Sequence, residues 1–215
     1  MEGKTESLHT EHKRDGHGHH HHERHGAKQP ERFDPAKAAL LDDPERFSYL
    51  PPAKILSLLN PPQNGMVVDF GTGTGTYAHE LAKLRPDLNI IAIDEQEEML
   101  DRVKEKLEKN PGLKITPLLT KTGTLPKLDA DGVFAVNVLH ELGDEALQDI
   151  KKIIKQEGKI LFIDWSSEID RPVGPPLDHV YSVKEAAARV KRFGFSVQKE
   201  EKLQYHYALI CLAKS

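Results

Sequence analysis

Met66-Val67-Val68-Asp69-Phe70-Gly71-Thr72-Gly73-Thr74-Gly75 is the stretch of the chain that indicates its fold. An apolar run leads into an acid, and glycine then stands at every second position. The apolar run predicts a buried parallel strand, and the glycines predict a tight turn whose backbone approaches a ligand. Residues 76–85 follow with a helical pattern that Pro86 ends. Together these features predict a small-molecule site at the carboxyl edge of a doubly wound α/β sheet.

A second acid, Asp94, follows the apolar run Ile90-Ile91-Ala92-Ile93 and therefore ends the next predicted strand. A carboxylate at that position can accept both hydroxyls of a ribose. Dinucleotide-binding proteins carry the pattern G-x-G-x-x-G, which would need its third glycine at Thr76. The chain has Gly75 instead. This departure counts against a nicotinamide-dependent oxidoreductase, which stays open as an alternative.

The acid Asp69 before G-x-G-x-G, and Asp94 before Met99-Leu100, resemble the first two motifs of class I S-adenosylmethionine-dependent methyltransferases. Residues 138–142, Val-Leu-His-Glu-Leu, are similar to the fourth motif of the ubiquinone/menaquinone-biosynthesis-like members. The resemblance runs from about residue 32 to the C-terminus. It implies a Rossmann-like seven-stranded α/β sheet in the order 3-2-1-4-5-7-6, with the last strand antiparallel, helices on both faces and a short N-terminal helical cap.

The resemblance also implies an activity: in-line transfer of a methyl group from S-adenosylmethionine to a small-molecule acceptor. A protein that binds this cofactor without turnover is a further alternative. The residues implied to bind the cofactor are Asp69, Gly71, Thr72, Gly73, Gly75, Asp94, Glu95, Met99, Thr122 and Asn137. The family often places an acid against the adenine amino group, but Lys121 stands there in this chain. A backbone carbonyl or a threonine hydroxyl would have to replace that acid.

Residues for chemistry and for the acceptor are expected at the carboxyl ends of the fourth and fifth strands. His140 and Asp164 are the candidate catalytic bases, because an imidazole titrates near neutral pH. A capping or core role is the alternative for His140. Trp165, His179 and Tyr181 are the candidate acceptor-binding residues. Packing for Trp165 and a surface position for His179 are the alternatives, and Phe33 and Tyr49 are candidate cleft-facing aromatics of the cap.

The remaining pattern predicts the elements of this sheet in order. Three short helical segments are expected after Asp34, Asp43 and Pro51, within a cap over residues 31–60 of a methyltransferase domain over residues 31–215. A helix over 95–109 and strands over 113–119 and 131–137 follow. Asp144 is expected to cap a helix whose last turns contain Lys151, Lys152 and Lys155, with Gly158 ending it. A strand over 159–165, a capping box at Ser182-Val183-Lys184-Glu185, and strands over 195–200 and 205–213 complete the chain.

Composition limits the classes of partner. The chain has 215 residues, with 30 Lys and Arg against 34 Asp and Glu, which gives a net charge of −4. This balance lacks the basic footprint of nucleic-acid binding, and no apolar run is long enough to cross a membrane. A single cysteine, Cys211, excludes an internal disulfide and suits a cytoplasmic protein.

Residues 1–30 form a polar tail that contains His17 and the run His19-His20-His21-His22. The tail has no apolar periodicity, so disorder is expected there. Such imidazoles can bind divalent metal nonspecifically, and we predict no defined metal site. The pattern leaves the oligomeric state undetermined.

Overall fold

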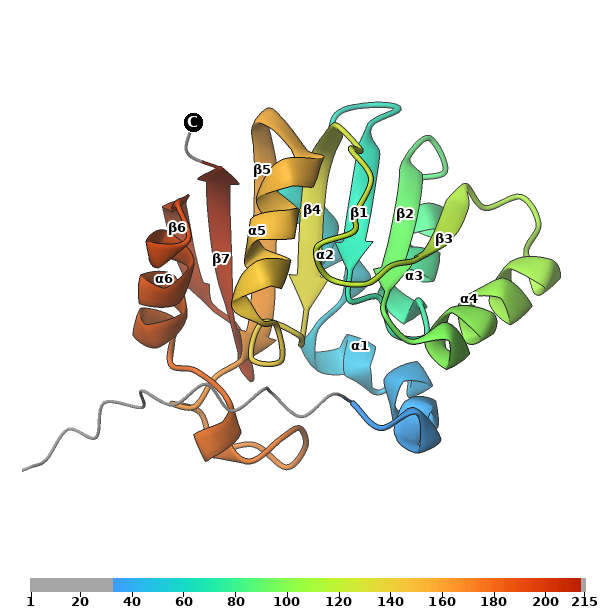
Figure 1. Cartoon of the computed structure of the whole chain (residues 1–215). Coiled ribbons are helices and arrows are strands. Elements are labelled where there is room, and N and C mark those ends of the chain that lie inside the picture. Colours follow the sequence, from blue (N-terminus) through green and yellow to red (C-terminus); the bar gives the residue numbers. More distant parts are fainter. Residues whose placement is uncertain (1–32, 214–215) are drawn as a thin grey trace, which may run out of the picture.

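A seven-stranded sheet forms the centre of the computed structural model, which describes residues 33–213 (Figure 1). Its order is β3-β2-β1-β4-β5-β7-β6, and β7 runs antiparallel to both of its neighbours. The predicted fold class, strand order and antiparallel last strand are therefore confirmed. The strands are β1 Met66–Phe70, β2 Asn89–Asp94, β3 Ile115–Leu119, β4 Ala130–Val136, β5 Ile154–Trp165, β6 Phe195–Lys202 and β7 His206–Ala213.

Helices cover both faces of the sheet. The helices α2 Pro52–Leu59, α3 Thr76–Leu84 and α4 Glu97–Lys109 pack on one face, and α5 Asp144–Ile153 and α6 Val183–Arg192 pack on the other. Each helix presents an apolar stripe to the strands, and the two layers of buried side chains form the core. None of the helices in residues 33–213 is long and apolar enough to span a bilayer.

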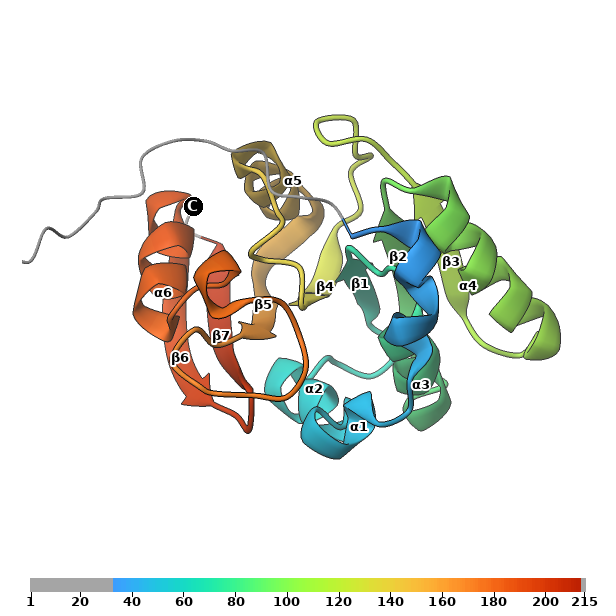
Figure 2. The same ribbon diagram turned by 90° about the horizontal axis from the view of Figure 1, so that it is seen from below.

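The N-terminal segment crosses the carboxyl edge of the sheet, as Figure 2 shows from below. It consists of the 3₁₀ helix η1 Pro35–Asp42 and the short helix α1 Arg46–Tyr49. Asp34 caps η1 as predicted, because its carboxylate accepts from Ala36 N at 3.0 Å and Pro35 starts the helix. A second short 3₁₀ helix, η2 Leu177–His179, lies in the loop that follows β5. The predicted tail of residues 1–30 lies outside the described residues.

The boundary between α5 and β5 differs from the prediction. Gly143 is the N-cap of α5, and Asp144 is its first residue rather than its cap. The helix ends at Ile153, so Lys155 lies in the strand, and Gly158 does not end the helix. Ala130 pairs with Ile154, and Gly132 pairs with Lys159, so the intervening residues of β5 form an irregularity. Glu157 has a positive φ of 65° there, a backbone change that helical periodicity does not reveal.

Candidate cofactor and acceptor site

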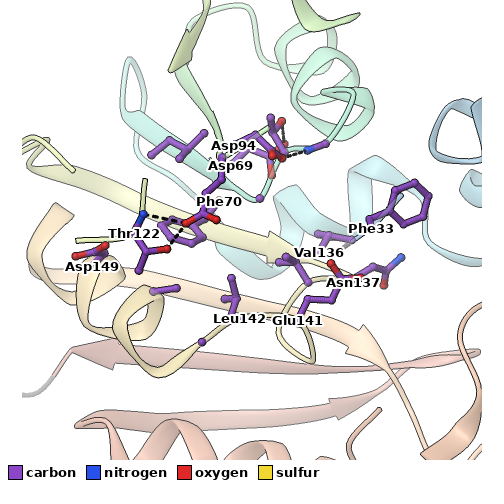
Figure 3. A pocket seen from close by; sticks show the side chains of 18 of the residues that line it. Phe33, Asp69, Phe70, Asp94, Thr122, Val136, Asn137, Glu141, Leu142 and Asp149 are labelled. Carbon is purple, nitrogen blue, oxygen red and sulfur yellow. Dashed lines mark hydrogen bonds between the residues drawn. The ribbon is translucent and has the colours of Figure 1, made fainter. Parts of the chain in front are cut away.

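A cleft of about 1680 Å³ opens at the carboxyl ends of β1, β2 and β4 (Figure 3). Its lining extends from Phe33 in the N-terminal segment to Arg192 in α6. Sites for one small molecule usually measure 300–1,000 Å³, so this cleft has room for two ligands at once. Asp69 and Asp94 lie on one side of it, and Asn137 and Glu141 lie on the other.

The glycine turn after β1 forms the floor of the cleft. Gly71 N and Thr72 N donate to Ile93 O at 3.0 and 2.8 Å, which ties the turn to β2. Gly71 and Gly73 have φ values of 74° and 55°, a region that L side chains rarely adopt. A Cβ at Gly73 would lie 2.9 Å from Leu41 Cδ1. The close approach at Gly73 is therefore to η1, a contact that the glycine pattern alone does not predict.

Two carboxylates lie beneath this turn. Asp94 accepts from Gly73 N at 2.8 Å and from Gln96 N at 3.0 Å, each through a different oxygen. Every carboxylate oxygen has a further lone pair, so both can still accept from a ligand hydroxyl. Asp69 accepts from Thr72 Oγ1 at 2.7 Å, and burial raises the pKa of Asp69 to about 7. Burial also raises the pKa of Asp94.

Asn137 follows β4 directly and faces the same cleft. Its backbone is left-handed, with φ of 58°, and its N–H donates to Ile163 O at 2.8 Å. Its Oδ1 is buried and has no hydrogen-bond partner among residues 33–213. A strained residue with an unsatisfied buried acceptor is typical of a ligand site, because both features carry a cost in the empty protein.

A loop over residues 120–125 closes one end of the cleft. Glu95 accepts from Thr122 N at 2.9 Å and from the Thr122 hydroxyl, and Asp149 of α5 accepts from Gly123 N at 2.5 Å. Lys121 also lines the cleft at this end. Asp149 is 1% exposed and was missed in the sequence. The feature of the sequence that could have indicated Asp149 is an acid beside the apolar stripe of a predicted helix.

His140 and Asp164 contact each other, but neither of them lines the cleft. His140 Nδ1 lies 2.9 Å from both Asp164 oxygens, and the backbone N–H of His140 and of Trp165 each donate to this carboxylate at 2.8 Å. Burial alone would lower the pKa of His140, but the Asp164 carboxylate raises that pKa to about 10. An imidazolium is already protonated and His140 does not line the cleft, so this arrangement favours a role for His140 other than that of the base. The catalytic roles of His140 and Asp164 stay predictions.

The three residues predicted to bind the methyl acceptor do not lie together in the structure. Tyr181 lines the cleft, whereas His179 is exposed on η2 and Trp165 is buried outside the lining. Trp165 stacks on His206, with ring centroids 4.1 Å apart and an interplanar angle of 27°. Tyr49 packs against both rings, at 5.8 and 5.9 Å, and does not line the cleft, whereas Phe33 does. Neither Trp165 nor His179 lines this cleft, and Trp165 packs against Tyr49 and His206. Their part in acceptor binding stays a prediction.

Of the other residues predicted to bind the cofactor, some line the cleft and one does not. Thr72, Glu95, Met99 and Thr122 line the cleft, whereas Gly75 does not. A Cβ at Gly75 would lie 2.8 Å from Val103 Cγ2, so this glycine allows α3 and α4 to approach each other. The described residues contain no group of three or more His, Cys, Asp or Glu side chains that could hold a metal ion.

A polar cluster that the sequence did not indicate fixes the N-terminal segment above the glycine turn. Asp42 at the end of η1 accepts from Thr74 Oγ1 at 2.6 Å, from Thr76 Oγ1 at 2.5 Å and from Lys106 Nζ at 2.5 Å. Lys106 also donates to Thr74 O at 2.9 Å. We call residues 35–42, held by these contacts, the strap. Its partners are distant in sequence, so no local pattern could have identified them.

Comparison with known proteins agrees with this geometry. Residues 67–158 match the model of the family described as "Methyltransferase domain". A methyltransferase from Aquifex aeolicus, described as SAM dependent, is 30% identical, with a TM-score of 0.79 over 84% of this chain and 99% of its own. A search of the curated proteins gives no significant match.

More distant solved structures share the fold. A type 11 methyltransferase from Sulfolobus solfataricus, described as putative, is 23% identical, with a TM-score of 0.63 over 78% of this chain and 94% of its own. Human N-acetylserotonin methyltransferase, solved in complex with SAM, is 20% identical, with a TM-score of 0.63 over 85% of this chain and 57% of its own.

The fold and the cleft thus define a class I Rossmann-like enzyme. The chain belongs to the S-adenosylmethionine-dependent methyltransferases, and S-adenosylmethionine is its methyl donor. The residues of the cleft fit that group. A carboxylate at the end of β2, an open glycine turn and the unpartnered amide oxygen of Asn137 offer acceptors for its hydroxyl and amino groups.

Proposed function

We propose that the protein methylates a small molecule that binds beside S-adenosylmethionine in this cleft. The single observation that carries the proposal is the buried, unpartnered Oδ1 of Asn137 across the cleft from Asp69 and Asp94. It supports one continuous site with acceptor groups on both walls. The volume of the cleft leaves space for a second ligand.

Each part of the cofactor has a proposed partner. Asp94 would accept the ribose hydroxyls, and residues 120–122 would contact the adenine through backbone groups and hydroxyls. Asp69 and Asn137 would hold the amino-acid end. When bound, the cofactor supplies a methyl group already activated by its sulfonium charge. The protein therefore has mainly to align the acceptor with that methyl group, and alignment can contribute roughly 7–11 kcal/mol.

A small acceptor is favoured over a nucleic acid by the charges at the rim. Asp144 and Glu145 are exposed on the first turn of α5 and line the cleft. Asp144 lies 3.5 Å from Arg189 Nη2, so Glu145 is the acid that would repel a phosphate backbone, which requires a basic surface.

Two measurements test the proposal. Calorimetry with S-adenosylhomocysteine should show one site per chain, and Asn137→Leu should weaken it, whereas His179→Gln on η2 should not. Methyl transfer from labelled cofactor should then be measured across a panel of small phenols, amines, thiols and carboxylic acids, with tRNA and protein mixtures as comparison. Transfer confined to the macromolecules would contradict a small acceptor. Absence of cofactor binding would contradict the site itself.

A further inference from the structure

Glu141 lies at the cleft end of a chain of three ionisable side chains. Asp164 is fully buried and holds His140 Nδ1 at 2.9 Å. The other ring nitrogen of His140, Nε2, lies 3.5 Å from Glu141 Oε1. Glu141 lines the cleft with 23% of its side chain exposed, whereas the His140 side chain is 9% exposed and lies behind it. Only the last member of the chain can meet a ligand.

The other carboxylates of the cleft are committed elsewhere or lie at its rim. Asp94 and Asp149 accept backbone N–H groups, and Glu95 accepts from Thr122. Glu185 forms the capping box of α6 with Ser182. Asp144 and Glu145 are exposed at the mouth, and Asp69 lies on the cofactor side beside Asp94. Glu141 is thus the carboxylate that faces the interior from the opposite wall.

We infer that Glu141 is the catalytic base, and that the acceptor presents a hydroxyl or an amine to it. The inference rests on the proposed function. As the acceptor oxygen or nitrogen bonds to the methyl carbon, the bond from carbon to sulfur breaks and its electron pair stays on sulfur. The proton of the acceptor passes to Glu141 and then to solvent at the cleft mouth. The neutral acceptor, the sulfonium and the carboxylate become a methylated acceptor, a thioether and a carboxylic acid, so charge balances.

The buried pair behind Glu141 gives this carboxylate its position. His140 is held from its far side by Asp164, and its backbone N–H is fixed by the same carboxylate. An imidazolium so held can donate to Glu141 but cannot take the acceptor's proton from it. His140 and Asp164 are therefore positioning residues, and Glu141 is the group that contacts the acceptor.

The test uses sinefungin, the cofactor analogue in which a carbon bearing an amine replaces the methylated sulfur. Its amine occupies the place of the methyl group and therefore reports the groups that face the acceptor. Calorimetry with the full-length protein should give the ratio of affinities for sinefungin and S-adenosylhomocysteine. In Glu141→Gln this ratio should fall at least ten-fold, about 1.4 kcal/mol, with affinity for S-adenosylhomocysteine retained.

Two further variants make the result decisive. Glu145→Gln removes a carboxylate at the cleft rim and should leave the ratio of affinities unchanged. Glu141→Asp keeps a carboxylate and should retain part of the preference for sinefungin. An unchanged ratio in Glu141→Gln would overturn the inference while leaving the proposed function intact. Equal losses in Glu141→Gln and Glu145→Gln would also overturn it, because they would indicate a general effect of charge. If the wild type bound neither compound, the proposed function itself would fail.

Discussion

At the scale of single residues, the Asp94 carboxylate both holds the glycine turn and offers acceptors to a ligand. Asp94 accepts N–H groups from Gly73 and Gln96, so it shapes the glycine turn before any ligand arrives. The same oxygens have capacity left for hydroxyls. A carboxylate fixed in this way is preorganised, and preorganisation lowers the entropic cost of binding.

Replacement of Asp94 should separate these tasks. Asp94→Asn keeps one oxygen and should weaken S-adenosylhomocysteine binding less than Asp94→Ala, which should cost about 1.5–3 kcal/mol, the usual worth of hydrogen bonds to a charged group. Calorimetry on variants with normal circular dichroism measures both. If Asp94→Ala bound as tightly as the wild type, Asp94 would not belong to the site.

The pair of His140 and Asp164 should make stability depend on pH. In the folded protein the pKa of His140 is about 10, above the ordinary value of 6.5. The contribution of the pair to the free energy of unfolding is therefore fully present below about pH 6.5. That contribution is lost as pH rises through about 10. His140→Gln leaves Asp164 buried without its cation and should cost about 3–5 kcal/mol at pH 7.

Urea unfolding at pH 6, 8 and 10 measures this effect. The difference in free energy of unfolding between wild type and His140→Gln should shrink as pH rises. The control is His179→Gln, because His179 is exposed on η2. A difference that stayed constant across this range would mean that the imidazole is not charged in the fold.

At the scale of elements, the strap is the part of the N-terminal segment that contacts the glycine turn and α4. Leu41 lies over Gly73, Gln96 Nε2 donates to Phe33 O at 3.1 Å, and Arg46 Nη1 donates to Leu41 O at 2.5 Å. These contacts hold η1 across the glycine turn and the start of α4. We therefore expect the strap to move when the cofactor exchanges through this side.

Weakening the strap should therefore accelerate cofactor release. Lys106→Met removes the ion pair between Lys106 and Asp42, whose two side chains are 25% and 32% exposed. A partly exposed pair of this kind contributes about 1 kcal/mol to holding the strap in place. We therefore expect the cofactor to be released roughly five-fold faster. Lys104→Met is the matched control, because Lys104 pairs with Asp101 on the exposed side of the same helix. Stopped-flow release of S-adenosylhomocysteine measures the rates, and equal rates in both variants would show that the strap does not gate release.

At the scale of the whole molecule, most of the architecture could be predicted from the sequence. The glycine motif, with an acid at or near the end of each of the first two strands, indicated the sheet, and Ser182 with Glu185 indicated the start of α6. Contacts that depend on the path of the chain could not be predicted. His140 and Asp164 are 24 residues apart, and Asp42 and Lys106 are 64 apart. Glu141 was missed because the neighbouring histidine carried the more familiar chemistry.

The polar tail should be dispensable for the cofactor. Its sequence has no apolar periodicity with which to dock, so deletion of residues 1–28 should leave affinity for S-adenosylhomocysteine within about two-fold. Calorimetry on the full and shortened chains checks this. A large loss of affinity would show that the tail covers the cleft.

The sequence contains one tryptophan, and its surroundings make it a natural optical reporter. Trp165 is 6% exposed, stacked on His206 and covered by the Arg171 guanidinium at 5.3 Å from its ring. Arg171 also donates to Ser166 O at 3.0 Å, which holds the loop after β5 over the indole. Burial shifts indole emission to shorter wavelengths, and wetting shifts it back. A movement of this loop that wets the indole would therefore shift the intrinsic fluorescence, without any attached dye, on the same samples used for binding and turnover.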